Sequence, residues 1–159
     1  MAGPVFLDDL VDALGSQWEE YTTYVDRETG EVHSVSRETM RLLDGEEDDE
    51  GEEGEEDPEV AVARLVLETD RMLALPSPWD VNEWEIMQEF ALSMRSDDIR
   101  DDLLNAIRGK GAFRYFKDTV RRYRIEQGWY DFRDQALREI AIDWCKQYGL
   151  ACCEGKRPV

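Results

Sequence analysis

The feature that most constrains the fold of this chain is an acidic run, EEDDEGEEGEED, at residues 46–57. It contains ten acids and two glycines. Such a composition offers no apolar surface to bury, and the like charges repel one another along the chain. We therefore expect a disordered acidic loop at residues 45–58, with folded structure before and after it.

Strand signals lie before this loop. The runs YTTYVD and EVHSVS are rich in β-branched residues, and the segment RETG between them ends at Gly30, which can adopt the positive φ of a tight turn. This pattern predicts a β-hairpin. Before it, apolar residues from Phe6 to Leu14 recur at helical spacing, so we expect an amphipathic helix opened by Pro4 and capped by Gly15.

After the loop the signals become mainly helical. The run EVAVARLVLETD favours a helix, whereas RMLALP favours a third strand beside the hairpin. From Pro78 onward four amphipathic helices are predicted, the first of which has a capping-box pattern formed by Asp80 and Glu83. Glycines are expected to end the next three helices, at Gly109, Gly128 and Gly149.

The fold class that follows is α+β and mainly helical. A small antiparallel sheet, formed by the N-terminal hairpin and the candidate third strand, is expected to pack with a C-terminal group of about four helices. The 159 residues, of which 42% are hydrophobic, are enough to bury a core. We expect a single domain over residues 1–159, with its helical part at residues 78–150.

Positive charge is concentrated in one stretch, RGKGAFRYFKDTVRRYR, at residues 108–124. It holds seven basic side chains and one acid in a chain of net charge −19, so the rest of the chain carries −25. At about 100° per residue, four of the basic side chains share one side of a helix. They are Arg114, Lys117, Arg121 and Arg124. The opposite side is expected to be apolar, with Phe113, Phe116, Val120 and Tyr123.

A fifth basic residue, Lys110, lies in the Gly-Lys-Gly turn that leads into this helix. Free backbone N–H groups and the positive dipole end at a helix start favour anions. Together these five residues form what we call the basic face. They predict a site for a polyanion, either a nucleic-acid backbone or an acidic protein partner. These cations, with the intervening Tyr115, could contact phosphates, and such contacts would position a complex without reading its sequence.

Other interpretations of this stretch stay open at this point. The basic face can instead pair with acids of neighbouring helices or of the acidic loop, and exposed ion pairs contribute about 0–1 kcal/mol each. The tethered acidic loop can cover the face as a polyanion mimic, or it can be a solubilising spacer. Gly109 and Gly111 favour a C-cap and a tight turn over a phosphate cradle, because the Walker pattern and its preceding strand are absent.

No catalytic constellation is recognised in the sequence. His33, the single histidine, falls in the expected second hairpin strand and is interpreted as structural. Cys145, Cys152 and Cys153 lack the C-x-x-C spacing of zinc or dithiol chemistry. We therefore expect no catalytic residue, no metal and no cofactor, and we favour a non-enzymatic binding or regulatory protein.

The alternative function is an enzyme or a small-ligand protein with an unrecognised site. The candidate position is near Trp129, Tyr130 and Arg133, where charged residues could line a pocket. A deep pocket with convergent buried polar groups would favour this alternative. A shallow basic surface would favour binding.

The cellular location is predicted from two features. The N-terminal MAGPVFLDD has no cationic region followed by a long apolar stretch, and the most apolar run, VAVARLVL, is short and contains Arg64. Three cysteines, two of them adjacent, give no even-numbered disulfide framework. We therefore expect a cytoplasmic protein with no membrane partner. The sequence leaves the oligomeric state open.

Several runs of the chain resemble the bacterial uncharacterised protein family (UPF) 0158. They are LPSPWDVNEWEIMQEF, NAIRGKGAFRYFKDTV, GWYDFRDQALREIAIDWC, LVDAL and Y-V-D-x-E-T-G-E-V, so the resemblance covers most of the chain outside the acidic loop. The run GKGAFRYFKD is the most specific of these. Trp84 and Arg122 depart from the residue types expected there. The resemblance implies an intracellular bacterial protein without an assigned activity, and it supplies no catalytic residues.

Overall fold

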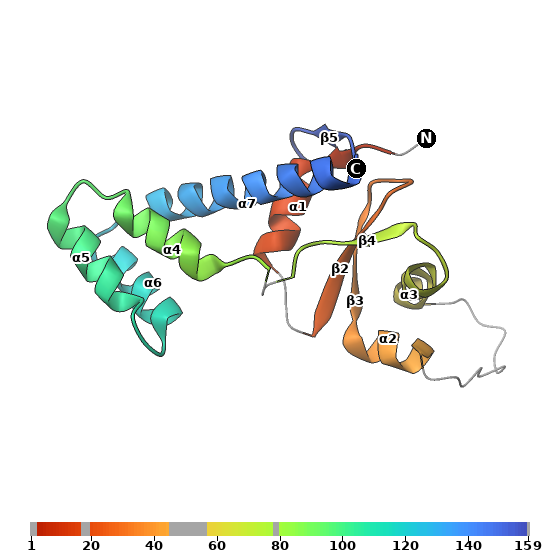
Figure 1. Cartoon of the computed structure of the whole chain (residues 1–159), viewed down its shortest axis with the longest axis horizontal. Coiled ribbons are helices and arrows are strands. Elements are labelled where there is room, and N and C mark those ends of the chain that lie inside the picture. Colours follow the sequence, from red (N-terminus) through yellow and green to blue (C-terminus); the bar gives the residue numbers. More distant parts are fainter. Residues whose placement is uncertain (1–2, 17–19, 45–56, 78–79, 159) are drawn as a thin grey trace. The chain divides into compact units, whose positions relative to one another are not determined.

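Figure 1 shows the computed structural model of the chain, which describes residues 3–16, 20–44, 57–77 and 80–158. Its architecture is α+β and mainly helical, as predicted. Two compact units are present, one made of Met1–Asp80 with Ile140–Val159 and the other of Val81–Glu139. That the whole chain forms one domain stays a prediction.

The predicted hairpin and its third strand are confirmed in the first unit. β2 (Tyr21–Asp26) pairs antiparallel with β3 (Val32–Ser36) on one edge and with β4 (Met72–Ala74) on the other, so the strand order is β3-β2-β4 (Figure 1). Gly30 has a φ of +78° in the hairpin turn. A Cβ at this position would lie 2.1 Å from the carbonyl oxygen of Pro4, so the turn requires glycine for two reasons.

Helices and a second, two-stranded ladder complete the first unit. β1 (Val5–Phe6) pairs parallel with β5 (Cys152–Cys153), and α1 (Leu7–Gly15) follows β1 directly. The predicted helix of residues 6–14 is therefore present but starts later, because Val5 and Phe6 are held in the ladder. Gly15 is the last helical residue and not the cap.

Two further helices flank the acidic run. α2 (Arg37–Asp44) was not anticipated from the sequence, although its start has a signal: the Ser36 hydroxyl accepts a hydrogen bond from the Thr39 N–H at 3.1 Å. α3 (Pro58–Glu68) is the predicted helix, capped by Asp57. Residues 45–56 of the predicted acidic loop lie outside the described residues. Its last residue, Pro58, already belongs to α3.

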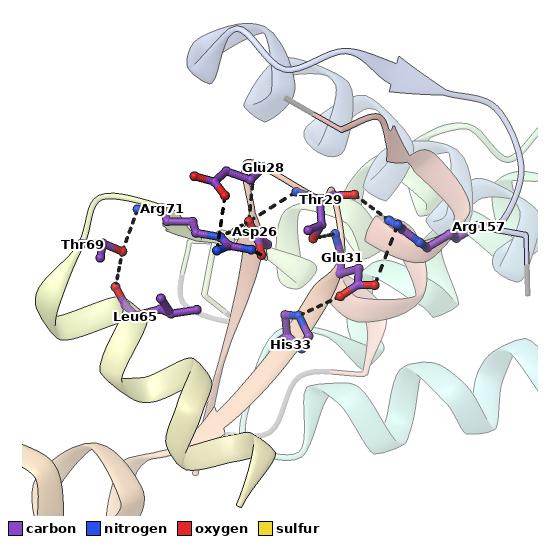
Figure 2. Close-up of polar contacts among 9 residues, drawn as sticks. All are labelled: Asp26, Glu28, Thr29, Glu31, His33, Leu65, Thr69, Arg71 and Arg157. Carbon is purple, nitrogen blue, oxygen red and sulfur yellow. Dashed lines mark hydrogen bonds and ion pairs between the residues drawn. The ribbon is translucent and has the colours of Figure 1, made fainter. Parts of the chain in front are cut away.

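A network of polar contacts fixes the hairpin turn (Figure 2). The Asp26 carboxylate accepts hydrogen bonds from the Arg71 guanidinium and from the N–H groups of Glu28 and Thr29. Arg71 directly precedes β4, so this ion pair joins the turn to the third strand. The side chain of Asp26 is only 5% exposed, which makes the pair an internal one.

The C-terminal segment reaches the same turn. The Arg157 guanidinium donates a hydrogen bond to the carbonyl oxygen of Thr29 at 2.8 Å and lies 3.8 Å from the carboxylate of Glu31 (Figure 2). Glu31 in turn lies 3.5 Å from the imidazole of His33 on β3. These charged side chains therefore contact one another at the turn end of the hairpin.

The C-terminal helices follow in the predicted number. α4 (Glu83–Leu92), α5 (Asp97–Ala106) and α6 (Ala112–Arg122) belong to the second unit, together with the part of α7 (Glu126–Tyr148) that ends at Glu139. Ser96 caps α5 as its position suggests, accepting from the Ile99 N–H. Within the described ranges, no helix is both long enough and apolar enough to cross a membrane.

Three predicted boundaries of these C-terminal helices are wrong. α5 ends at Ala106 with Ile107 as its C-cap, before the expected end at Gly109. The predicted Asp80–Glu83 capping box does not form, because the Asp80 carboxylate accepts from the N–H and hydroxyl groups of Ser77, and Asn82 caps α4 instead. Gly128 does not end a helix. It lies inside α7, and the preceding helix has already ended at Arg122.

An aromatic cluster forms the centre of the second unit. Phe90 of α4 lies edge to face with Phe116 of α6 and with Trp129 and Phe132 of α7, at centroid distances between 5.4 and 6.1 Å. The Phe116 and Trp129 rings are closer still, at 4.7 Å. Such pairs add about 0.5–1.5 kcal/mol each beyond the area they bury. The cluster therefore fixes which side of α6 faces inward.

Candidate polyanion-binding site

Helix α6 carries most of the basic stretch, and left-handed residues mark both of its ends. Gly111 precedes the helix with a φ of +76°. After the helix, the Arg124 N–H donates to the Arg121 carbonyl and the Ile125 N–H donates to the Val120 carbonyl, each at 3.1 Å. These are the two hydrogen bonds of a Schellman motif, in which glycine usually takes the left-handed position. Here Arg124 takes it, with a φ of +56°.

The packing of α6 exposes the basic face. Phe116 and Val120 are 0% and 2% exposed on the inner side of the helix, where the aromatic cluster lies. The side chains predicted to bind a polyanion are all exposed; they are Lys110, Arg114, Lys117, Arg121 and Arg124. The structure therefore brings the three helical members of the basic face to the outer side of one helix, with one member at each end.

Within the described parts of the chain, no carboxylate forms an ion pair with any side chain of the basic face. The Lys117 ammonium lies 5.2 Å from the centroid of the Phe113 ring, a cation–π contact that leaves its charge in place. Neutralisation by neighbouring helices, one of the interpretations left open by the sequence, is thus not seen in these parts. Any contact with residues 45–56 of the acidic loop falls outside the described residues.

Arg122 behaves differently from the basic face. Its guanidinium lies 2.9 Å from the Asp102 carboxylate of α5 and 5.0 Å from the centroid of the Tyr123 ring. The Tyr123 hydroxyl also donates a hydrogen bond to Asp102, and this bond raises the pKa of Tyr123 above its ordinary value. Arg122 therefore ties α6 to α5, and its charge is already matched.

An open groove of about 470 Å³ lies between α5 and α6. It is lined by Asp102, Asn105, Ala106, Gly109, Lys110, Tyr115, Thr119 and Arg122. Lys110 belongs both to this groove and to the basic face. We call this feature the α5–α6 groove.

One aromatic side chain of this surface, Phe113, was predicted wrongly, whereas Tyr115 lies among the exposed cations as expected. Phe113 was predicted to face inward but is 44% exposed, and Tyr115 is 57% exposed. Phe113 lies in the first turn of α6, and the centroid of its ring lies 5.2 Å from the Lys117 ammonium. The angular position of Tyr115, away from Phe116, was the signal available in the sequence.

The three residues of the alternative site, Trp129, Tyr130 and Arg133, do not share one exposed surface. Trp129 is 3% exposed in the aromatic cluster, whereas Tyr130 is 59% exposed. The Arg133 guanidinium forms an ion pair with Glu83 at 2.5 Å. None of these three residues lines the α5–α6 groove. A small-ligand site there stays a prediction.

A metal centre needs several His, Cys, Asp or Glu side chains close together. Within the described residues, no three side chains of the His, Cys, Asp and Glu types are grouped as metal ligands. A second groove, of about 390 Å³, lies in the first unit, and its lining holds three acids, Asp9, Asp12 and Glu31, with His33 and one arginine, Arg157. Because acids outnumber cations there, this groove does not suit a polyanion.

Fold and surface define a mainly helical α+β protein with an exposed cationic helix. The chain belongs to the uncharacterised protein family UPF0158, whose model matches residues 2–153. This confirms the resemblance noted in the sequence. The chain is similar to the UPF0158 protein PA5073 of the bacterium Pseudomonas aeruginosa, with 27% identity over 139 residues, or 87% of this chain and 78% of that protein. No solved structure matches the chain.

Proposed function

We propose that this is a cytoplasmic, non-enzymatic binding protein whose basic face recognises a polyanion. The single observation that carries the proposal is the exposure of the five predicted side chains on and around α6, without ion-pair partners among the described residues. The partner is either a nucleic-acid backbone or an acidic protein segment, since both present closely spaced anions.

The geometry supports binding in spite of the net charge of −19. Electrostatic attraction is local, because salt screens charges beyond about 10 Å at 0.1 M ionic strength. An anion at the outer side of α6 is therefore attracted chiefly by the basic face. The remaining acidic surface repels polyanions from other approaches and so favours docking on this one side.

The test is a triple charge reversal, in which Arg114, Lys117 and Arg121 are replaced by Glu. Binding of a labelled 12-nucleotide single strand, a 12-base-pair duplex and a polyglutamate peptide is measured by fluorescence anisotropy at 50 and 200 mM salt. Each phosphate neutralised on a single strand contributes about −0.7 to the slope of log K against log salt. We expect a slope near −3.5 for five contacts and a slope weaker by about 2 in the variant.

The matched control reverses three exposed cations elsewhere. Arg41, Arg95 and Lys146 are exposed, and replacing them by Glu makes the same change in net charge. The control variant should bind like the wild-type protein. Equal binding by the wild-type protein and the α6 variant, or binding insensitive to salt, would contradict the proposed function.

A further inference from the structure

We propose that the α5–α6 groove accepts an unstacked base of a single-stranded nucleic acid whose phosphates lie on the basic face. This inference rests on the proposed function and identifies its partner class. A single strand presents two chemistries in alternation, a phosphate and a planar ring. The basic face is the complement to the phosphate, and the α5–α6 groove offers two complements to the base.

The first complement is an aromatic ring at a suitable cavity. The groove volume of about 470 Å³ falls within the range of about 300–1,000 Å³ that small-ligand pockets occupy. Tyr115 lines it and is 57% exposed. Its ring packs over Gly111, where an added Cβ would lie 3.2 Å from the ring atom Cε2. The ring is therefore held in place while most of it remains open to a stacking partner.

The second complement is a side chain able to pair with a base edge. Asn105 of α5 lines the groove and is exposed. Its amide is both donor and acceptor, and in the described parts of the chain it has no hydrogen-bond partner. The Thr119 hydroxyl, by contrast, donates to the carbonyl oxygen of Tyr115, so its proton is already used.

Asp102, the one acid in the groove lining, repels a nucleotide phosphate only weakly. The Asp102 carboxylate is matched by the Arg122 guanidinium at 2.9 Å and accepts a hydrogen bond from Tyr123. Lys110 adds a positive charge to the groove lining that no described carboxylate pairs with. The groove therefore combines a matched ion pair with a free cation.

The groove and the basic face are adjacent at the start of α6. Lys110 lines the groove and belongs to the basic face, and Arg114 directly precedes Tyr115 in the helix. A phosphate at Lys110 or Arg114 would place the neighbouring base near the Tyr115 ring. Asp118, the single acid of α6, is exposed one turn after Arg114 and lies on the same side of the helix as the cations.

Other polyanions match only half of this arrangement. A duplex keeps its bases stacked and paired, so it can use the basic face but cannot offer a free ring to Tyr115. An acidic peptide offers carboxylates to the cations but no base edge to Asn105. Stacking on an exposed aromatic residue beside a cationic surface is the mode by which single strands are bound with little sequence preference.

The test is the Tyr115→Ala variant of the full chain, with a fluorescein-labelled 12-nucleotide oligouridylate as the probe and a 12-base-pair duplex for comparison. Loss of one stacked base is worth about 1–3 kcal/mol, so affinity for the single strand should fall about 5-fold or more. Affinity for the duplex should not change. Tyr130→Ala is the matched control, because Tyr130 is 59% exposed on α7 and lies outside the groove.

Two further measurements test whether the ring of Tyr115 stacks on a base and whether that base lies in the α5–α6 groove. Tyr115→Phe retains the ring and should retain the affinity, and irradiation of the wild-type protein with a 4-thiouridine-containing strand should crosslink to residues of the groove. Equal single-strand affinity of the Tyr115→Ala and Tyr130→Ala variants would overturn the inference. If the triple charge reversal still abolished binding, the proposed function would stand. Absence of binding to every probe would overturn both.

Discussion

The Arg71 guanidinium binds both carboxylate oxygens of Asp26, with Nε 2.8 Å from Oδ1 and Nη2 2.7 Å from Oδ2 (Figure 2). Burial alone would raise the pKa of Asp26. The hydrogen bonds from Arg71 and from the N–H groups of Glu28 and Thr29, with the positive charge of Arg71, outweigh burial and lower it to about 2. The pair therefore couples the stability of the first unit to pH.

We expect Asp26→Asn to remove this pH dependence. Because the folded-state pKa of Asp26 lies below the ordinary value of 3.8, the stabilisation is fully present above that value and is lost as the pH falls towards 2. The shift corresponds to about 2 kcal/mol. Urea unfolding followed by circular dichroism should show a wild-type advantage at pH 6 that has largely disappeared at pH 2.

The control for this prediction is Glu28→Gln. The Glu28 carboxylate also lies near Arg71, at 3.3 Å, but its side chain is 64% exposed. An exposed pair of this kind contributes about 0–1 kcal/mol. The variant should unfold nearly like the wild-type protein at both pH values. If it lost as much stability as Asp26→Asn, the bidentate pair would not be the source of the effect.

Arg124→Gly should stabilise the second unit. Arg124 adopts a φ of +56° in the Schellman motif that ends α6. A left-handed backbone costs a non-glycine residue about 1 kcal/mol or more, and glycine does not bear this cost. The urea midpoint should therefore rise. Under the proposed function the same substitution should weaken polyanion binding, because it removes one cation of the basic face.

The matched comparison is Arg121→Gly, three residues earlier and inside α6. There the backbone is helical, and glycine is less favourable than other residues by up to about 1 kcal/mol. The two substitutions remove the same charge but should move the urea midpoint in opposite directions. A midpoint that falls in both variants would show that the left-handed conformation of Arg124 is not strained.

The sequence predicted those elements whose signals are local. The hairpin follows from two β-branched runs and Gly30, and β4 follows from the need of a hairpin for another strand. The boundary of α6 could not be predicted in this way, because Arg124 occupies a position where only glycine would give a signal. Gly128 was then wrongly predicted to end this helix, because an isolated glycine inside a long helix is tolerated.

One part of the candidate site also follows from local signals in the sequence, and another part does not. Helical periodicity places Arg114, Lys117 and Arg121 on one side without any tertiary information. The α5–α6 groove depends instead on how two helices pack across the turn at residues 107–111. The periodicity of one helix does not predict its packing on another. Asn105 and Tyr115 therefore could not be grouped from the sequence alone.

Gly30→Ala should destabilise the hairpin. The residue combines a φ of +78° with a Cβ position 2.1 Å from the carbonyl oxygen of Pro4, so an alanine strains the backbone and displaces the N-terminal segment. Substitution of glycine where φ is positive costs more than about 1 kcal/mol. Gly109→Ala is the comparison, because an added Cβ there has no atom within 4 Å. Thermal unfolding should show a loss for Gly30→Ala and little change for Gly109→Ala.

Cys145 should resist alkylation in the folded protein while Cys152 reacts. Burial raises the pKa of the Cys145 thiol, and its side-chain hydrogen bond with Cys152 raises it further. Since the thiolate is the nucleophile and Cys145 is 0% exposed, both the population and the access of the reactive form are low. Iodoacetamide labelling at pH 8 followed by peptide mass spectrometry should modify Cys152, which is exposed, well before Cys145. In urea the two should react alike. Comparable labelling of both cysteines in the absence of urea would mean that the C-terminal end of α7 opens faster than its packing implies.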